Sequence, residues 1–413
     1  MIRILRGVGI CALPVLVALW VGATTFGGSL LPWRPVMVDL EVYREAARVL
    51  LAGGDFYDLP GELQFLYPPL AAVLAVPLAV LPTTLVQVGW TIASTLALLA
   101  VLHRLGVRGW PLSLLGSACV VFAEPVRQTL AFGQLGVFLV ALVVLDLVPG
   151  PRVLRRRLLP EGTWTALAAA IKLTPAIFVV YLLVVGRRRA FVSAVAAGIV
   201  LTGAAALVVP RASYTFWSRL AHGDTGLGMS IIYSMNQSVM ADVVRIFGLG
   251  SGATLLGLAL SAAVAALGVW VAHVWHRRGE VGLAVNLCGV ASLLASPVSW
   301  LHHFVWVVPL ALSLVLGLLR GGPGGPVLPA WFRVLGLVFV GWVVVAPFRR
   351  LPNGADVELL YTPAQNLLAS VTLLLGVALL VAALVLGSRR APAPLEQQTE
   401  QVPGRRFENR TRR

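Results

Sequence analysis

Hydrophobic residues in this chain come in long runs that are separated by short polar breaks. The runs at residues 7–31 and 83–102 contain no charged side chain. A membrane-spanning helix needs about 20 mainly apolar residues, whereas the strands of a membrane barrel alternate apolar and polar positions. The pattern therefore predicts an all-α, polytopic transmembrane bundle with loops on its outer face. By the length rule we expect about 11–13 membrane helices.

The first run has the flanks of a secretory signal peptide, because Arg3 and Arg6 precede it. It continues to about Leu31, however, without a persuasive small-residue cleavage site. We therefore expect it to be retained as the first membrane helix.

The composition agrees with a membrane protein. Hydrophobic residues make up 58% of the chain and charged residues 12%, and the mean hydropathy is +0.88. Soluble domains have about 45–50% apolar and about 25% charged residues. The net charge of +15 comes almost entirely from arginine, and Lys172 is the single lysine. These arginines lie in loops beside apolar runs, where they act as topology signals, so nucleic acid is not an expected partner.

The arginine-rich loops predict the orientation of the chain, because positive residues favour the cytoplasmic side. The segments assigned to that side are 104–108, 152–157, 187–189, 277–278, Arg320 and the tail from residue 389. The N-terminus joins them. The connections assigned to the outer side are 32–69, 124–134, 210–252, 296–303 and 349–365.

Two places do not follow a simple alternation of spans. Residues 70–81 and 83–102 both look membranous, yet the charge rule allows one net crossing there. Either residues 70–81 form a short half-helix or one arginine loop is misassigned. Residues 163–172 and 175–185, flanked by arginines on both sides, predict a short hairpin with its turn at residues 172–175.

The chain divides into one membrane domain, residues 1–388, and a tail, residues 389–413. The tail is rich in Pro, Gln, Glu and Arg, so we expect it to be disordered in the cytoplasm. Residues 321–326 form a glycine- and proline-rich connector within the membrane domain. The three cysteines, Cys11, Cys119 and Cys288, lie in apolar runs without metal-ligand spacing.

Polar and ionisable residues at the membrane edge gather on the predicted outer side. Such groups are costly in a bilayer and commonly functional. They are Asp39, Glu41, Tyr67, Glu124, Arg127, Gln134, Lys172, Asn236, Gln237, His302 and His303. A transporter, which is the alternative class of function, would place polar groups near the midplane and repeat half of its fold. We find neither pattern, so a site at the outer leaflet is favoured.

Six motifs occur in order between residues 39 and 303. They are an acidic residue in the first outer loop, Leu66-Tyr67-Pro68-Pro69, Gly133-Gln134, Ile171-Lys172-Leu173-Thr174-Pro175, Asn236-Gln237-Ser238, and Ser-Pro-x-Ser-Trp-x-His-His at residues 296–303. In this order the motifs resemble the polyprenyl-phosphate-mannose-dependent α-mannosyltransferases of actinobacteria. That family includes the α-1,2-mannosyltransferase that elongates phosphatidylinositol mannosides. The resemblance implies a GT-C class fold, a lipid-linked sugar donor, a glycolipid or lipoglycan acceptor and an outward-facing site in the cell membrane.

The implied reaction inverts the anomeric carbon in a single displacement. One carboxylate takes the acceptor proton, and cations or hydrogen-bond donors receive the charged phosphate. The resemblance makes Asp39 the expected base, with Glu41 second. Asp39 alone could equally be a solvated loop residue or a carboxylate favoured by a helix N-terminus. An Asp-x-Glu pair could bind a divalent ion, but the resemblance is to users of lipid monophosphates, so we expect no metal and no cofactor.

The remaining candidates also have purely structural interpretations. Lys172 is expected at the phosphate or a lipid headgroup, although membrane lysines commonly extend to the interface. His302 and His303 are expected to act on phosphate or acceptor, with at most one facing the bundle, or else they belong to an aromatic belt. Glu124 and Arg127 are further outer-face candidates. Tyr67, Gln134, Asn236 and Gln237 would bind sugar hydroxyls or satisfy breaks in the backbone. A non-catalytic assembly protein would tolerate replacement of all these residues.

Overall fold

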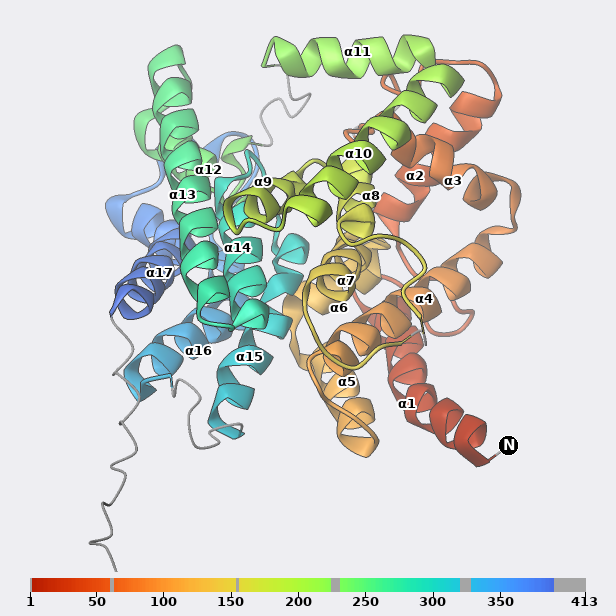
Figure 1. Ribbon diagram of the computed structural model, residues 1–413. Helices are drawn as coiled ribbons and strands as arrows, with labels where there is room; N and C mark the ends of the chain where they lie inside the picture. Colours follow the sequence, from red (N-terminus) through yellow and green to blue (C-terminus); the bar gives the residue numbers. More distant parts are fainter. Residues whose placement is uncertain (1, 60–62, 154–155, 224–230, 320–327, 390–413) are drawn as a thin grey trace, which may run out of the picture.

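The computed structural model describes residues 2–59, 63–153, 156–223, 231–319 and 328–389 (Figure 1). Helices dominate these ranges, and the one β pairing within them is an isolated bridge between Ser29 and Arg34. The connector at residues 321–326 and the tail from residue 390 lie outside the described residues. The predicted all-α polytopic class is confirmed.

The first half of the described chain carries α1 (Ile2–Thr24), α2 (Val38–Leu51), α3 (Pro69–Val80), α4 (Thr83–Arg104), α5 (Trp110–Phe122), α6 (Glu124–Phe132), α7 (Gly136–Leu147), α8 (Thr163–Ile171), η1 (Thr174–Ala176), α9 (Ile177–Val184) and α10 (Arg188–Val208). The second half carries α11 (Pro210–Ala221), α12 (Val239–Phe247), α13 (Ser251–Arg277), α14 (Val281–Ala295), η3 (Leu301–Trp306), α15 (Val307–Leu319), α16 (Ala330–Val345), η4 (Pro347–Arg350), η5 (Val357–Leu360) and α17 (Pro363–Ser388).

Five helical stretches are long and apolar enough to cross a membrane. They are α4, α10, α13, α17 and the stretch Ala330–Arg350 that contains α16. Helices α6 and α7 pass the same test as a pair, although they are bent by 116°. The other apolar helices are shorter, at 10–17 residues. The expected 11–13 membrane helices thus require the shorter helices to be counted, and this number stays a prediction.

Helix α3 explains the crowded region before α4. Its 12 residues rise about 18 Å, which is too short for a hydrocarbon core of about 30 Å. It packs mainly against the amphipathic helix α2. Of the two alternatives left open by the sequence, the short half-helix is the one that the structure has.

The break near residue 172 also lies where the sequence predicts it. Helix α8 ends at Ile171, Lys172 has extended backbone angles, and η1 begins the return at Thr174. The residues of η1 pack against α8 and α9.

Three of the arginine loops lie together at one end of the bundle. Arg104 donates to the carbonyl of Val148 at 3.0 Å, and Arg187 pairs with Glu161 at 2.5 Å. Arg157 pairs with Asp146, whose other carboxylate oxygen accepts the backbone N–H groups of Gly162 and Thr165. The end of α7 is thereby tied to the start of α8. The structure thus brings together loops that the charge rule assigns to one side.

A buried ion pair holds the irregular segment before α12. Ser238 caps this helix by accepting the N–H of Ala241. Arg245 is 3% exposed, pairs with Asp242, and donates to the carbonyls of Ile232, Tyr233 and Asn236. Residues 233–236 lie in no helix that could satisfy their carbonyls, so the guanidinium replaces the missing backbone partners.

We expect Arg245→Met to destabilise the folded protein strongly. The change leaves the Asp242 carboxylate buried without its cation, and removing one partner of a buried pair costs about 3–5 kcal/mol. A thermal melt in detergent should show a clearly lower midpoint than wild type. The exposed Arg108, changed to Met, serves as the control and should melt like wild type. Equal midpoints for wild type and Arg245→Met would contradict this role.

Candidate functional site

Asp39 is positioned by a close approach between α2 and the corner that joins α6 to α7. The N–H of Met37 donates to the carbonyl of Ala131 at 2.8 Å. Gly133, at the corner, has φ +69°, and a Cβ there would lie 2.5 Å from the Cβ of Leu40. A side chain at position 133 would therefore push the first turn of α2 away. The Gly133-Gln134 motif thus brings the corner against Asp39.

Gln134 links Asp39 to two tyrosines. Its carbonyl oxygen Oε1 accepts the hydroxyl of Tyr43 at 3.1 Å and that of Tyr67 at 3.4 Å. The two phenol oxygens are 3.0 Å apart. Because Oε1 is engaged by the phenols, the amide nitrogen is left to donate to the Asp39 carboxylate, with which Gln134 forms a side-chain hydrogen bond.

The half-buried position of Asp39 raises its pKa to about 6. Burial is the main cause, because it disfavours the charged carboxylate. The hydrogen bond from Gln134 and the positive charge of Lys172 act in the opposite direction. A carboxyl group with a pKa near 6 is a stronger base than an ordinary aspartate and is still largely ionised at neutral pH.

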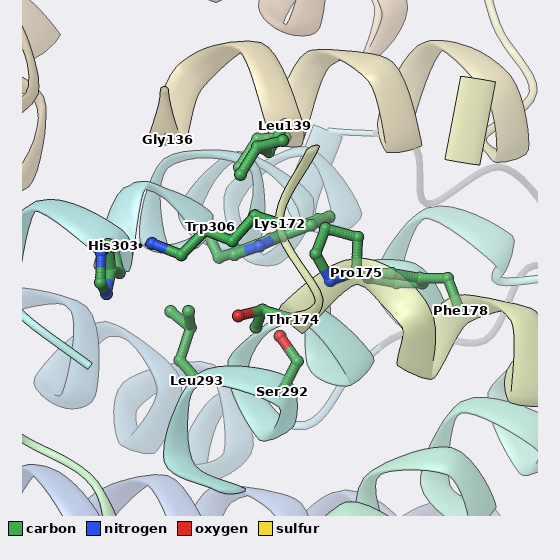
Figure 2. Close-up of a pocket in the computed structure, with 11 residues that line it drawn as sticks. Gly136, Leu139, Lys172, Thr174, Pro175, Phe178, Ser292, Leu293, His303 and Trp306 are labelled. Carbon is green, nitrogen blue, oxygen red and sulfur yellow. Dashed lines mark hydrogen bonds between the residues drawn. The ribbon is translucent and has the colours of Figure 1, made fainter. Parts of the chain in front are cut away.

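Lys172 lies between the tyrosines and the histidine pair. Its Nζ is 5.3 Å from the centre of the Tyr67 ring and 2.7 Å from Nε2 of His303. Figure 2 shows the lysine side chain extended toward the imidazole of His303. The extended backbone at position 172 ends α8 and releases this side chain from the helix.

The other ring nitrogen of His303 determines the chemistry of this contact. The N–H of Trp300 donates to Nδ1 at 3.1 Å, so in a neutral ring the proton belongs on Nε2, facing Lys172. A lysine ammonium has only donors. Two donors therefore converge on one point. Such a pair is satisfied either by losing a proton or by an anionic oxygen that accepts from both.

His302 differs from its neighbour. It is 6% exposed, and its Nε2 has no hydrogen-bond partner in the described part of the chain. Its ring meets Phe132 edge to face at 5.9 Å, and its backbone carbonyl accepts the Thr129 hydroxyl. The two imidazoles thus have different surroundings, as successive residues of a helix would.

A pocket with about 410 Å³ of empty space, part of it open to solvent, lies beside the Lys172–His303 pair. Its wall is mainly apolar and includes Leu139, Phe178, Leu293 and Trp306. In Figure 2 the hydroxyls of Thr174 and Ser292 face each other across the lower part of this space. The cavity therefore has a polar, cationic end and an apolar body.

Five of the predicted site residues lie outside this cluster. The exposed Glu41 pairs with the buried Arg44 at 2.8 Å and with the partly exposed Arg48 at 2.7 Å. Glu124 is buried against Arg127 and Arg349. Arg349 of that group lies over the ring of Phe26, which meets the Phe132 ring at a tilted angle. Phe132 in turn meets the His302 ring edge to face.

Asn236 and Gln237 are occupied by backbone groups. Asn236 donates to the carbonyls of Ile231 and Pro297 and accepts the N–H of Ser299, while Gln237 donates to Ser234. Of the two functions that the sequence left open for these amides, the contacts favour support of a broken backbone. Through Ser299 they hold the segment that leads to His303.

The sequence analysis missed Tyr43 and the backbone of Trp300. Tyr43 follows Asp39 by four residues on α2, so their side chains share one face of the helix. That spacing could have identified it. The N–H of Trp300 carries no signal in the sequence, because every residue except proline has one.

The described residues contain no group of three or more His, Cys, Asp or Glu side chains that could hold a metal ion. Asp39 and Glu41 do not converge, because Glu41 is held by its arginines. Independence from metals remains an expectation.

Comparison with known proteins identifies relatives of the chain. The family model described as glycosyltransferase family 87 matches residues 65–297. A polyprenol-phosphate-mannose-dependent alpha-(1-2)-phosphatidylinositol mannoside mannosyltransferase of Mycobacterium tuberculosis is 31% identical over 78% of this chain and 80% of its own length. A corresponding pentamannoside mannosyltransferase of the same species is 35% identical over 80% of this chain and 78% of its own.

A phosphatidylinositol mannoside mannosyltransferase of Mycolicibacterium smegmatis is 31% identical over 81% of this chain and 80% of its own length. No solved structure matches the chain. The family model covers more than half of the sequence, and the matched stretch includes Tyr67, Gln134 and Lys172 of the cluster. The chain therefore belongs to glycosyltransferase family 87.

Proposed function

We propose that this enzyme transfers mannose from a polyprenyl-phosphate-mannose donor to a glycolipid or lipoglycan acceptor at the extracytoplasmic face of the cell membrane. The observation that carries the proposal is the convergence of two hydrogen-bond donors, Lys172 and His303, beside a carboxyl group of raised pKa, Asp39. The relatives named above support the choice of donor and the class of acceptor.

The donor fits the cluster in one orientation. Its phosphate oxygens accept from the Lys172 ammonium and from Nε2–H of His303, which resolves the conflict between the two donors. The first isoprene units enter the apolar cavity lined by Leu139, Phe178 and Trp306. The sugar then lies on the side of Asp39, Tyr67 and Gln134, where phenol and amide groups meet its hydroxyls.

The reaction is a single displacement. The acceptor oxygen forms a bond to the anomeric carbon while the bond from that carbon to the phosphate oxygen breaks, and the electron pair leaves with the phosphate. Asp39 takes the proton of the acceptor hydroxyl. Lys172 and His303 stabilise the charge that grows on the leaving oxygen. Attack opposite the phosphate inverts the anomeric configuration, so a β-linked donor gives an α-linked product.

The distribution of charge supports the proposed sidedness. The arginine loops that contact one another around Arg104, Arg157 and Arg187 belong on the cytoplasmic side by the positive-inside rule. In the site, the centre of the Tyr43 ring lies 6.2 Å from that of Trp90, in the half of α4 that is away from Arg104. Donor and acceptor would then both be in the outer leaflet.

We expect Asp39→Asn to lower transferase activity by about 10²-fold or more, because the acceptor loses its general base. The assay follows the mass of the product formed from polyprenyl-phosphate-mannose and a phosphatidylinositol mannoside, in a buffer that contains EDTA. Glu41→Gln, two residues away and on the surface, is the matched control and should retain most activity. Near-normal turnover of Asp39→Asn would remove this carboxylate from the mechanism, and failure of wild type with this donor would remove the proposed substrate.

The pH dependence should carry the signature of Asp39. A general base must be ionised, so kcat/KM is expected to fall as the pH drops through about 6. Gln134→Leu removes a hydrogen bond that favours the carboxylate, so the acid limb should move to higher pH in that variant. If the acid limb of kcat/KM lies at the same pH in wild type and in Gln134→Leu, it belongs to a group other than Asp39.

The orientation can be tested by cysteine labelling in a background without the three native cysteines. Leu63→Cys lies in the loop before α3 and should react with a membrane-impermeant maleimide in intact cells. Arg108→Cys, near the arginine loops, should react only after permeabilisation. The opposite pattern would place the site in the cytoplasm.

A further inference from the structure

A second, smaller pocket, with about 190 Å³ of empty space that is partly open to solvent, lies where α3, α8, α10 and α11 meet. Its lining includes Pro68, which directly follows Tyr67, and Ala170, two residues before Lys172. The first cavity begins at Lys172 and continues with Thr174. The two pockets share no lining residue, and the end of α8 lines one while the residues from Lys172 onward line the other.

Ser213 gives this cavity an unsatisfied polar group. The serine is 5% exposed and lines the cavity, and its hydroxyl has no hydrogen-bond partner in the described part of the chain. The backbone N–H of Ser213 is already satisfied by the carbonyl of Val209. A buried hydroxyl without a partner costs free energy, so this position is suited to a ligand with an accepting oxygen.

Helix α11 gives the cavity the chemistry of a membrane interface. It lies across the end of α10, at the top of Figure 1. Tyr214 and Trp217 on it are 77% and 37% exposed, and Arg211 and Arg219 are exposed as well. Exposed tyrosine and tryptophan are enriched at the level of lipid headgroups, where arginines attract anionic lipids. Helix α10 is largely exposed along its apolar length and so forms a wall open to lipid.

A glycerolipid suits this pocket better than the donor chain does. A polyprenyl chain has no hydrogen-bonding group beyond its phosphate, so it would leave the Ser213 hydroxyl unsatisfied. The apolar cavity that begins at the phosphate-binding residues already suits that chain. A diacylglycerol phosphate carries ester carbonyls that accept a hydrogen bond a short distance below an anionic headgroup.

We propose that this cavity binds the glycerol ester region of an anionic glycolipid acceptor, with Ser213 donating to an ester carbonyl and the arginines of α11 near the lipid phosphate. The proposal rests on the proposed function and adds the route by which the acceptor reaches it. Donor and acceptor lipids then approach from opposite sides of Lys172. Their head groups meet at Asp39.

The test compares two acceptors that share a headgroup, a diacyl phosphatidylinositol mannoside and its deacylated, water-soluble form. Ser213→Leu fills the cavity and removes the hydroxyl. We expect it to raise the KM for the diacyl acceptor about tenfold and to leave the KM for the deacylated acceptor and for the donor unchanged. Ser218→Leu, on the same helix and not lining the cavity, should behave like wild type.

Ser213→Ala decides the matter if the leucine variant does not fold. It removes only the hydroxyl and should raise the KM for the diacyl acceptor by a smaller factor. A rise in donor KM alone, or equal rises for both acceptors, would overturn the proposal.

Native mass spectrometry separates the two hypotheses. Wild type should retain the diacyl lipid better than Ser213→Leu whether or not mannose is transferred. If wild type transfers no mannose but still retains the diacyl lipid better than Ser213→Leu does, the proposed function is contradicted and the lipid-binding role of the cavity is supported. If both proteins retain the lipid equally, the lipid-binding role of the cavity is contradicted.

Discussion

The need to satisfy every backbone polar group in an apolar environment shapes this protein more than any single contact does. Helices satisfy themselves, but a site requires side chains at places where the helix is interrupted. Here the interruptions are the corner at Gly133, the break at Lys172 and the segment before His303. Each is held by buried groups, and together they place a carboxylate, an amine and an imidazole within one cluster.

This constraint sorts the polar residues into two kinds. Asn236 is committed to three backbone groups and Arg245 to three carbonyls, so neither is free to receive a substrate. Gln134 instead uses both its amide oxygen and its amide nitrogen for hydrogen bonds to side chains at and around Asp39. The first kind supplies rigidity, and the second sets the protonation and orientation of reactive groups.

Much of the helical membrane fold could be predicted from the sequence, because the length of the hydrophobic runs and the placement of the arginines depend on the bilayer alone. The grouping of Asp39, Lys172 and the histidines followed from placing them on one side of the membrane. The pairing of Glu124 with Arg349 could not be foreseen, since the two lie 225 residues apart in the sequence. A side-chain amide can support a broken backbone, as in Asn236, or orient groups of the site, as in Gln134. The sequence does not distinguish these two uses, and only the packing does.

The use of arginine for every cation but one has a chemical consequence. Guanidinium groups do not react with the reagents that acylate amines, so Lys172 supplies the one side-chain primary amine of the sequence. A single acylation event inside the protein would therefore occur at the site itself. The rate at which the Lys172 amine is acylated therefore reflects whether an anion occupies the point where Lys172 and His303 meet.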